Sequence, residues 1–187
     1  MLAGHSSHLI VGGARSGKSR HSLSLARERS ARIAFVATAQ AGDADMAARI
    51  ARHRADRPSS WLTVEEPLDV AAACRRLADR ADLLLVDCLT LWVSNRLLRG
   101  DEDKAILEGA DDLAAFMGAR EASLIIVSNE VGEGVHPPTP AGLRFQDLLG
   151  LVNQRVAEAA DRVTLMVAGI PLTLKDGSRH DQSPQAP

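Results

Sequence analysis

The sequence contains little of what several specialised classes of protein require. Its two cysteines, Cys74 and Cys88, are too few for a disulfide framework, which indicates a reducing, cytoplasmic compartment. Positive charge is not in excess, because 22 Lys and Arg against 24 Asp and Glu give a formal net charge of −2. This excludes a broadly basic nucleic-acid-binding surface, although not a local basic patch. No run approaches the ~18 consecutive apolar residues of a membrane helix, so we expect neither a nucleic-acid partner nor a membrane span.

What the sequence does contain is an alternation of two hydrophobic periods. Several apolar runs are continuous, as in strands buried on both faces of a parallel sheet. Six such runs are found, at His8–Gly12, Ile33–Ala37, Trp61–Val64, Leu83–Asp87, Leu124–Ser128 and Val163–Ala168. Helical spacing appears between Phe145 and Ala159, and between Asp43, a potential N-cap, and Asp56, shortly before Pro58. The pattern predicts an α/β fold, an open and mostly parallel sheet with helices on both faces.

The length of 187 residues suits one domain, which we place at residues 1–175. The remaining segment, residues 176–187, has no large apolar side chain and is predicted to be a flexible tail. The alternative for this segment is a surface arm that docks on a neighbouring subunit.

A phosphate-binding loop follows the first predicted strand. The segment Gly12–Ser19 reads GGARSGKS and fits the pattern G-x-x-x-x-G-K-[ST]. Its glycines let backbone N–H groups surround phosphate oxygens, and Lys18 supplies a positive charge. Ser19 supplies a hydroxyl ligand for Mg²⁺, and the helix predicted over Arg20–Arg29 directs its positive end at the anion. The sequence therefore predicts binding of a nucleoside triphosphate.

The metal ion needs a second ligand, usually an acid at the end of a neighbouring apolar strand. Asp87 closes the run Asp82–Asp87 and occupies that position. Its alternative role is to cap the segment that begins at Cys88, a residue more often found in a core than as a reactive thiol.

Two classes of triphosphate enzyme are separated by simple motifs. A GTPase switch is excluded, because no N-K-x-D motif is present and Asp147–Gly150, the one D-x-x-G match, lies within a helical stripe. A small-molecule kinase stays open, because arginines after the second strand could form a lid over the phosphates. These are Arg49, Arg52, Arg54 and Arg57.

His53 lies among these arginines, at the border between the apolar and charged faces of the predicted helix. Met46 and Ile50 share its flank at helical spacing. A neutral imidazole is a nucleophile toward phosphorus, and flanking arginines stabilise the charge that develops on phosphoryl oxygens. From spacing alone, a structural or surface histidine is the better interpretation.

The ordered motifs resemble one family, the bifunctional adenosylcobinamide kinase / adenosylcobinamide-phosphate guanylyltransferases of cobalamin biosynthesis. The resemblance runs from about residue 8 to 175. Beyond the phosphate-binding loop it is carried by short segments: Phe35–Gln40, Met46–Ile50 with His53 and Arg57–Pro58, Asp87–Thr90, Val93–Asn95, Val127–Gly132, Val152–Arg155 and Ala168–Ile170.

The resemblance implies two reactions. One phosphorylates adenosylcobinamide, and the other transfers GMP from GTP to adenosylcobinamide phosphate through a guanylyl-histidine at His53, with Lys18 as the second catalytic residue. GTP, ATP and Mg²⁺ are the implied cofactors, with Ser19 and Asp87 as metal ligands. The implied nucleotide site comprises Gly12, Gly13, Ala14, Arg15, Ser16, Gly17, Lys18, Ser19, Ala37, Thr38, Ala39, Arg54, Ala55, Asp56, Arg57, Glu65 and Asp87.

Within that site, the Glu65 carboxylate suits recognition of the guanine edge. Without the family resemblance, an acid in a solvated loop is an equally good interpretation of Glu65. Asn129 and Glu130 are weaker candidates for the kinase reaction. The resemblance also implies a homotrimer, to which Leu91–Leu98 could contribute if it is not packed internally. Some relatives place a second histidine or an acid near the nucleophile, where this chain has Arg52.

Two other functions stay open at this point. A simple P-loop kinase, in which His53 merely sits in an arginine lid, transfers a γ-phosphoryl group without covalent GMP. A non-catalytic nucleotide-binding module binds nucleotide without turnover.

Overall fold

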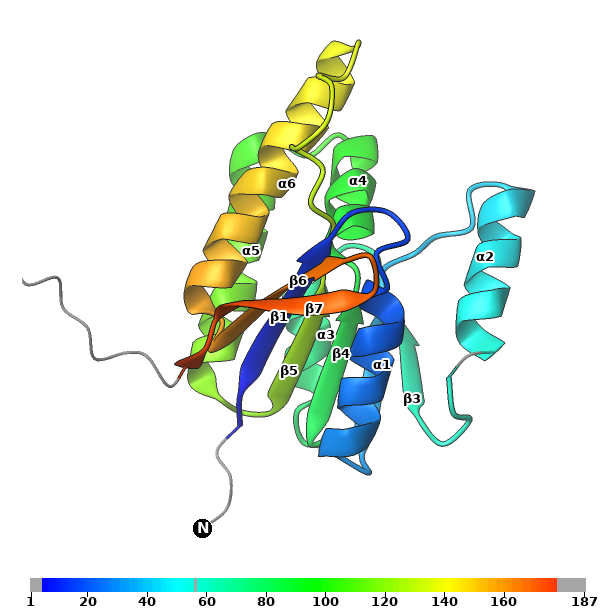
Figure 1. Ribbon diagram of the computed structural model, residues 1–187, viewed down its shortest axis with the longest axis vertical. Helices are drawn as coiled ribbons and strands as arrows, with labels where there is room; N and C mark the ends of the chain where they lie inside the picture. The colour runs from blue at the N-terminus through cyan, green and yellow to red at the C-terminus, as the bar shows by residue number, and fades with distance from the viewer. Residues whose placement is uncertain (1–4, 56, 178–187) are drawn as a thin grey trace, which may run out of the picture.

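The computed structural model describes residues 5–55 and 57–177, in which one seven-stranded sheet lies between two layers of helices (Figure 1). The elements are, in chain order, β1 (Ser7–Gly12), α1 (Lys18–Arg29), β2 (Ile33–Ala37), α2 (Ala44–Ala55), β3 (Leu62–Glu65), α3 (Val70–Leu77), β4 (Leu83–Asp87), α4 (Leu89–Arg99), α5 (Asp103–Ala119), β5 (Ser123–Val127), α6 (Pro140–Ala159), β6 (Arg162–Val167) and β7 (Ile170–Lys175). The predicted α/β fold is confirmed.

The strands follow the order β3-β2-β4-β5-β1-β6-β7 and are parallel except for β7. The register places Asp87, the last residue of β4, opposite Ala37 of β2 and Val127 of β5. Three neighbouring strands therefore end at the same level, and β1, whose Ile10 lies opposite Val127, continues to Gly12. In an open parallel sheet, this edge is where ligands bind.

Both faces of the central strands are buried, which explains the continuous apolar runs. On one face, Ile10, Leu85 and Ile125 pack with Ala26 of α1. On the other face, the alternate residues of the same strands pack against α3, α4, α5 and α6. Leu84 of β4 and Leu149 of α6, for example, belong to one buried cluster. The strands β1, β2, β4, β5 and β6 thus contribute side chains to two cores, so their sequences do not alternate, whereas β7 is mostly exposed.

The predicted helices form with small shifts at their ends. The helix expected from Arg20 begins at Lys18, directly after the phosphate-binding loop. The one expected from Asp43 to Asp56 is α2, and the Asp43 carboxylate accepts the Met46 N–H at 2.7 Å, as an N-cap does. Asp56 lies outside the described residues. The stripe around Phe145–Ala159 is α6, which also contains Asp147–Gly150, as expected.

The strand β7 is not predicted from the sequence. It joins β6 through a two-residue turn in which Ala168 and Gly169 have φ values of 52° and 83°. This backbone twist is typical of tight β-hairpins. Pro171 has no N–H to donate and fits only at the edge of a sheet, where β7 lies.

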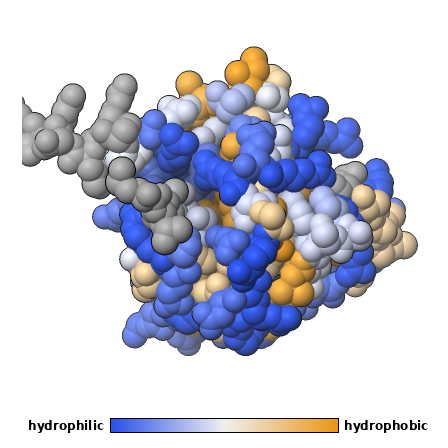
Figure 2. All heavy atoms as spheres, turned by 90° about the horizontal axis from the view of Figure 1, so that it is seen from below, coloured by the Kyte–Doolittle hydropathy of each residue, from blue (hydrophilic) through white to orange (hydrophobic). Residues whose placement is uncertain are grey.

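The predicted tail starts at Asp176, whose carboxylate pairs with Arg162 at 3.3 Å. Residues 178–187 lie outside the described residues, so tail flexibility stays a prediction. Across 5–55 and 57–177 no helix has the length and apolarity to cross a bilayer. Figure 2 shows the molecule from the end opposite the carboxyl ends of the strands, where hydrophilic side chains predominate.

His8 is a buried histidine in β1. Its Nε2 lies 2.8 Å from the Thr164 hydroxyl of β6, while its Nδ1 finds no hydrogen-bond partner in residues 5–55 and 57–177. Burial lowers its pKa to about 4, and the positive charges of Arg29, Arg162 and His21 act in the same direction. The folded protein therefore holds this imidazole in its neutral form.

We predict that this histidine makes the fold sensitive to acid. Its pKa is about 6.5 in the unfolded chain, so the unfolded state binds a proton first as the pH falls from about 6.5 to 4. The stabilisation is complete above that range and is lost within it, by about 2–3 kcal/mol at pH 4.5. Urea unfolding at pH 7 and 4.5 measures the loss, which should be smaller in His8→Gln; an equal loss in both proteins would contradict the assignment.

Candidate active site

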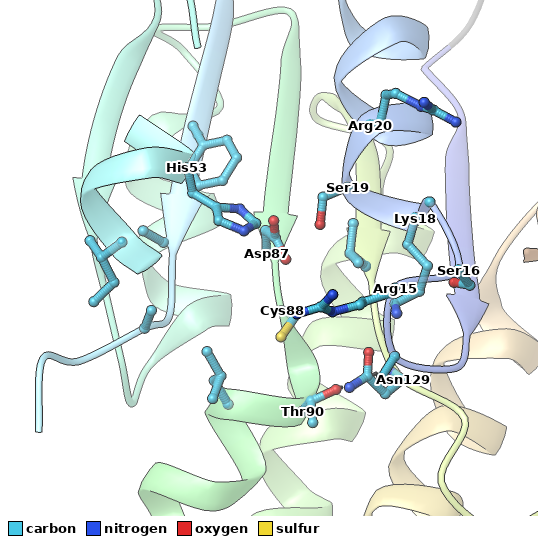
Figure 3. A pocket seen from close by; sticks show the side chains of 18 of the residues that line it. Arg15, Ser16, Lys18, Ser19, Arg20, His53, Asp87, Cys88, Thr90 and Asn129 are labelled. Atoms are coloured by element: carbon cyan, nitrogen blue, oxygen red, sulfur yellow. Dashed lines mark hydrogen bonds between the residues drawn. The ribbon is translucent and has the colours of Figure 1, made fainter. Parts of the chain in front are cut away.

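A cavity of about 670 Å³ opens at the carboxyl ends of the strands. Its walls come from the phosphate-binding loop and α1, from the ends of β2, β4 and β5, from α2, and from the β6–β7 turn. Of the predicted site, it brings together Ala14, Arg15, Ser16, Gly17, Lys18, Ser19, Ala37, Ala39, His53, Arg57 and Asp87. Figure 3 shows how the side chains of several of these residues converge.

The phosphate-binding loop requires glycine at two positions. Gly12 has a φ of 152°, and a Cβ added there would lie 2.5 Å from the Met166 carbonyl oxygen. Gly17 has a φ of 96°, and its added Cβ would lie 3.3 Å from the Gly169 Cα. A side chain at either position would push the loop away from β6 and the β6–β7 turn.

Neighbouring turns hold this loop through backbone hydrogen bonds. The Gly169 N–H donates to the Ser16 carbonyl at 2.9 Å, and the Glu130 N–H donates to the Gly12 carbonyl at 3.2 Å. The residues involved are far apart in sequence. Glu130 thus acts on the loop through its backbone, a role that no sequence motif indicates.

Lys18 and the start of α1 are arranged for an anion. The Lys18 side chain is buried, and its Nζ donates to the Gly13 carbonyl at 2.8 Å. Gly17 is the N-cap of α1 and has no side chain to accept the first N–H groups of the helix, which therefore face the loop. The combination of helix end, loop and lysine is suited to a polyphosphate.

Ser19 and Asp87 form the predicted metal-binding pair. The Ser19 hydroxyl hydrogen-bonds the Asp87 carboxylate. Burial raises the pKa of Asp87, while nearby His53, Lys18 and Arg57 and this hydrogen bond oppose the rise. No group of three or more His, Cys, Asp or Glu gathers as a metal site among the residues described. One hydroxyl and one carboxylate fit Mg²⁺, which takes its other ligands from water and substrate phosphates.

The helix α2 carries His53 to the cavity. It stands away from the rest of the protein beyond the β3 edge of the sheet (Figure 1). Met46, Ile50 and His53 line the cavity from one side of α2, as the helical spacing predicts. In Figure 3 the His53 ring points toward Asp87. The structure therefore places this imidazole within the site and not in bulk solvent.

Arg57 follows α2 and also lines the cavity. Its guanidinium carbon lies 3.9 Å from the centre of the Phe35 ring. Burial lowers the pKa of Arg57, and its buried Nε and Nη1 have no hydrogen-bond partner among the described residues. A partly desolvated cation whose donors are not all used is suited to receive a ligand anion.

Other predicted residues lie outside the lining of the cavity. Arg54 pairs with Glu65 at 2.6 Å, and both side chains are exposed. Ala55 is exposed at the end of α2, and Gly12 and Gly13 form the base of the loop. Asp56 is not among the described residues.

Thr38 is fully buried behind the cavity wall. Its hydroxyl donates to the Cys88 carbonyl at 2.8 Å and accepts the Cys88 N–H at 2.7 Å. The Asn95 side chain donates to the Thr38 carbonyl at 2.8 Å. The side chain therefore joins the ends of β2 and β4, and its predicted contact with a nucleotide has no support from this geometry.

Both cysteines are free thiols. Cys88 lines the cavity, but burial raises its pKa to about 11, so it remains a protonated thiol at neutral pH.

A polar cluster at the end of β5 was only partly expected. The Ser128 hydroxyl donates to the Asn153 carboxamide oxygen at 2.6 Å, and the Asn153 amide donates to the Asn129 carbonyl at 2.9 Å. The Asn129 N–H donates to the Thr90 hydroxyl at 2.9 Å. Asn129 and Thr90 line the cavity, whereas the buried Asn153 of α6 holds them in place.

The segment Leu91–Leu98 is mostly packed internally. Trp92 and Val93 are buried and Leu97 packs against the core, while Leu98 is 84% exposed. Leu91 lines the cavity. This favours internal packing over the predicted subunit interface for this segment.

Comparison with known proteins decides the family. Residues 8–174 match the family model described as cobinamide kinase / cobinamide phosphate guanyltransferase, CobU. The chain belongs to the CobU family. In this CobU family protein, the phosphate-binding loop, His53 and Asp87 line one cavity.

Named relatives agree with this family. The chain is 48% identical over 168 residues to the bifunctional adenosylcobalamin biosynthesis protein CobP of Pseudomonas aeruginosa, covering 89% of this chain and 96% of that one. It is 39% identical over 181 residues to CobU of Salmonella typhimurium, covering 89% and 98%. Among solved structures, a KaiC-like protein of Pyrococcus horikoshii aligns with a TM-score of 0.49 and 14% identity, over 87% of this chain and 71% of that one.

We predict that Asn153→Ala destabilises the CobU fold by about 2–4 kcal/mol. The buried Ser128 hydroxyl and the Asn129 carbonyl would both lose their partner. Urea unfolding measures the change, with the exposed neighbour Gln154→Ala as the matched control. Equal stability of the two variants would show that the polar cluster contributes little.

Proposed function

We propose that this protein phosphorylates adenosylcobinamide and then transfers GMP from GTP to adenosylcobinamide phosphate, giving adenosylcobinamide-GDP. The observation that carries the proposal is the placement of His53 in the same cavity as the phosphate-binding loop. A triphosphate on this loop would have an imidazole on one side and the Ser19–Asp87 pair at its base.

For guanylyl transfer, a ring nitrogen of His53 attacks the α-phosphorus of GTP. The new N–P bond forms while the bond from the α-phosphorus to the bridging oxygen breaks, and pyrophosphate leaves. Lys18 and the start of α1 stabilise the charge on the departing pyrophosphate. An oxygen of adenosylcobinamide phosphate then displaces the imidazole, which restores His53. Mg²⁺ held by Ser19 and Asp87 would supply further charge neutralisation of the phosphates.

Arg57 supports this proposal as a second cation beside His53. Its buried Nε and Nη1 have no partner within the described part of the chain, so phosphate oxygens can satisfy them. The charge that develops on the equatorial oxygens during transfer strengthens such hydrogen bonds. Arg57 therefore stabilises the transferring group from the side of α2.

Glu65 is proposed to recognise the guanine edge. Its carboxylate is paired with Arg54 on the surface, and an exposed pair of this kind contributes at most about 1 kcal/mol. A guanine that offers N1–H and N2–H₂ donors can therefore replace Arg54 at little cost. The kinase reaction uses ATP or GTP as phosphoryl donor.

The protein is further proposed to form a homotrimer through the β6–β7 hairpin. Ile170, Leu172 and Leu174 of β7 are 69%, 54% and 58% exposed, and Val167 of β6 is 56% exposed. Alternation and the pairing of β6 with β7 place the four side chains on one face of the sheet. An uncovered apolar edge strand is suited to a subunit contact.

A covalent labelling experiment tests the nucleophile. We predict that incubation with α-labelled GTP gives a protein label that is stable to base and labile to acid, as a phosphoramidate is. His53→Asn should lose at least about 99% of the label because an amide is not a nucleophile toward phosphorus. His136→Asn, an exposed loop variant, is the matched control and should label like the wild type. Equal labelling of His53→Asn would refute the role of His53 and favour a simple kinase.

The assembly is tested by light scattering. We predict a mass about three times the 19.9 kDa of one chain for the wild type and a smaller mass for Leu172→Asp. The control Thr173→Asp places the same charge on the other face of β7 and should keep the larger mass. Dissociation of both variants, or of neither, would assign the contact to another surface.

A further inference from the structure

The cavity has two sides, because β4 lies between β2 and β5 in the sheet. On the β2 side stand α2, His53 and Arg57. On the β5 side stand Thr90 at the start of α4 and Asn129 after β5. Asp87 ends the strand between them, and the phosphate-binding loop spans the base of both sides (Figure 3). A triphosphate on this loop is therefore accessible from two directions.

The β5 side is rigidly built. Asn129 uses both backbone groups within the protein, since its N–H donates to Thr90 and its carbonyl accepts from Asn153. What the residue presents to the cavity is its side-chain carboxamide (Figure 3). The Thr90 oxygen accepts the Asn129 N–H, and its hydroxyl also hydrogen-bonds the neighbouring Cys88 thiol. Two neutral polar groups are thus held at a fixed position.

The chemistry of this side differs from that of the β2 side. Among the described residues, Asp87 is the one charged side chain that β4, β5 and α4 bring to the cavity wall. The apolar side chains on this side are those of Leu91 and Val127, and Figure 3 shows the guanidinium of Arg15, from the phosphate-binding loop, beside Cys88. A phosphate-binding site needs cationic side chains, and in this cavity these come from the phosphate-binding loop and from the segment near α2. A carboxamide and a hydroxyl between alkyl groups fit the hydroxyl of an aliphatic alcohol.

We propose that Thr90 and Asn129 form the subsite for the acceptor alcohol of the phosphoryl transfer, on the side of the nucleotide opposite His53. This inference rests on the proposed kinase function. The alcohol oxygen attacks the terminal phosphorus, its O–P bond forms, and the bond from that phosphorus to the bridging oxygen of the nucleotide breaks. The nucleoside diphosphate leaves, and the alcohol proton passes to water. The pair orients the alcohol, while guanylyl transfer to His53 does not involve it.

The test measures two reactions on the full-length protein. Phosphorylation of adenosylcobinamide is followed with varied acceptor and with varied nucleotide, and covalent labelling by α-labelled GTP is measured without acceptor. For Asn129→Leu, which keeps both backbone hydrogen bonds, we expect the acceptor KM to rise about tenfold or more. The nucleotide KM and the label yield should stay within about twofold.

Thr90 gives a second series. Thr90→Val should raise the KM for the acceptor alcohol, but it also removes the hydroxyl oxygen to which the Asn129 N–H donates. It is therefore compared with Thr90→Ser, which keeps the hydroxyl and should restore the KM for the acceptor alcohol. Thr63→Val on β3, outside the cavity wall, is the matched control. If Asn129→Leu melts far below the wild type, Asn129→Ala replaces it.

An unchanged acceptor KM in Asn129→Leu would overturn the subsite. So would a parallel rise of the nucleotide KM with loss of label, because the pair would then serve the nucleotide. A wild type that labels with GMP but does not phosphorylate adenosylcobinamide would instead refute the proposed kinase function.

Discussion

The parallel register of β2, β4 and β5 is the constraint on which the site depends. Because Ala37, Asp87 and Val127 lie opposite one another, the loops that follow these strands leave the sheet at one level. The hydroxyl of Thr38 fixes β2 to β4, and the carboxamide of Asn153 fixes the end of β5 to α6. These buried hydrogen bonds orient the strand ends without contact with a ligand.

The phosphate-binding loop depends on the same edge. Its shape needs close backbone approach at Gly12 and Gly17, and its carbonyls are held by turns after β5 and β6. Since those turns also line the cavity or border it, a change in one would reach the loop through backbone hydrogen bonds. The start of α1 and Lys18 then provide a fixed positive environment before any ligand binds.

The helix α2 is built differently from the other helices. Its side toward the cavity carries Met46, Ile50 and His53, and most of its remaining described residues are exposed. The stable core thus lies under the phosphate-binding loop, whereas the proposed nucleophile stands on an element with little packing of its own. One loop can in this way serve two reactions, with a rigid polar side at β5 and an imidazole on a separate helix.

The sequence by itself determined every strand except β7, because runs buried on both faces are continuous. It also determined the loop and the cap at Asp43, because their signals are local. It also predicted the helical flank of His53, and the resemblance in its motifs named the family. Only the tertiary structure decided that Thr38 is internal, that Thr90 and Asn129 face the cavity, and that Glu130 and Gly169 brace the loop. These roles depend on backbone groups and on strand neighbours far apart in the chain, which hydrophobic period and local spacing do not encode.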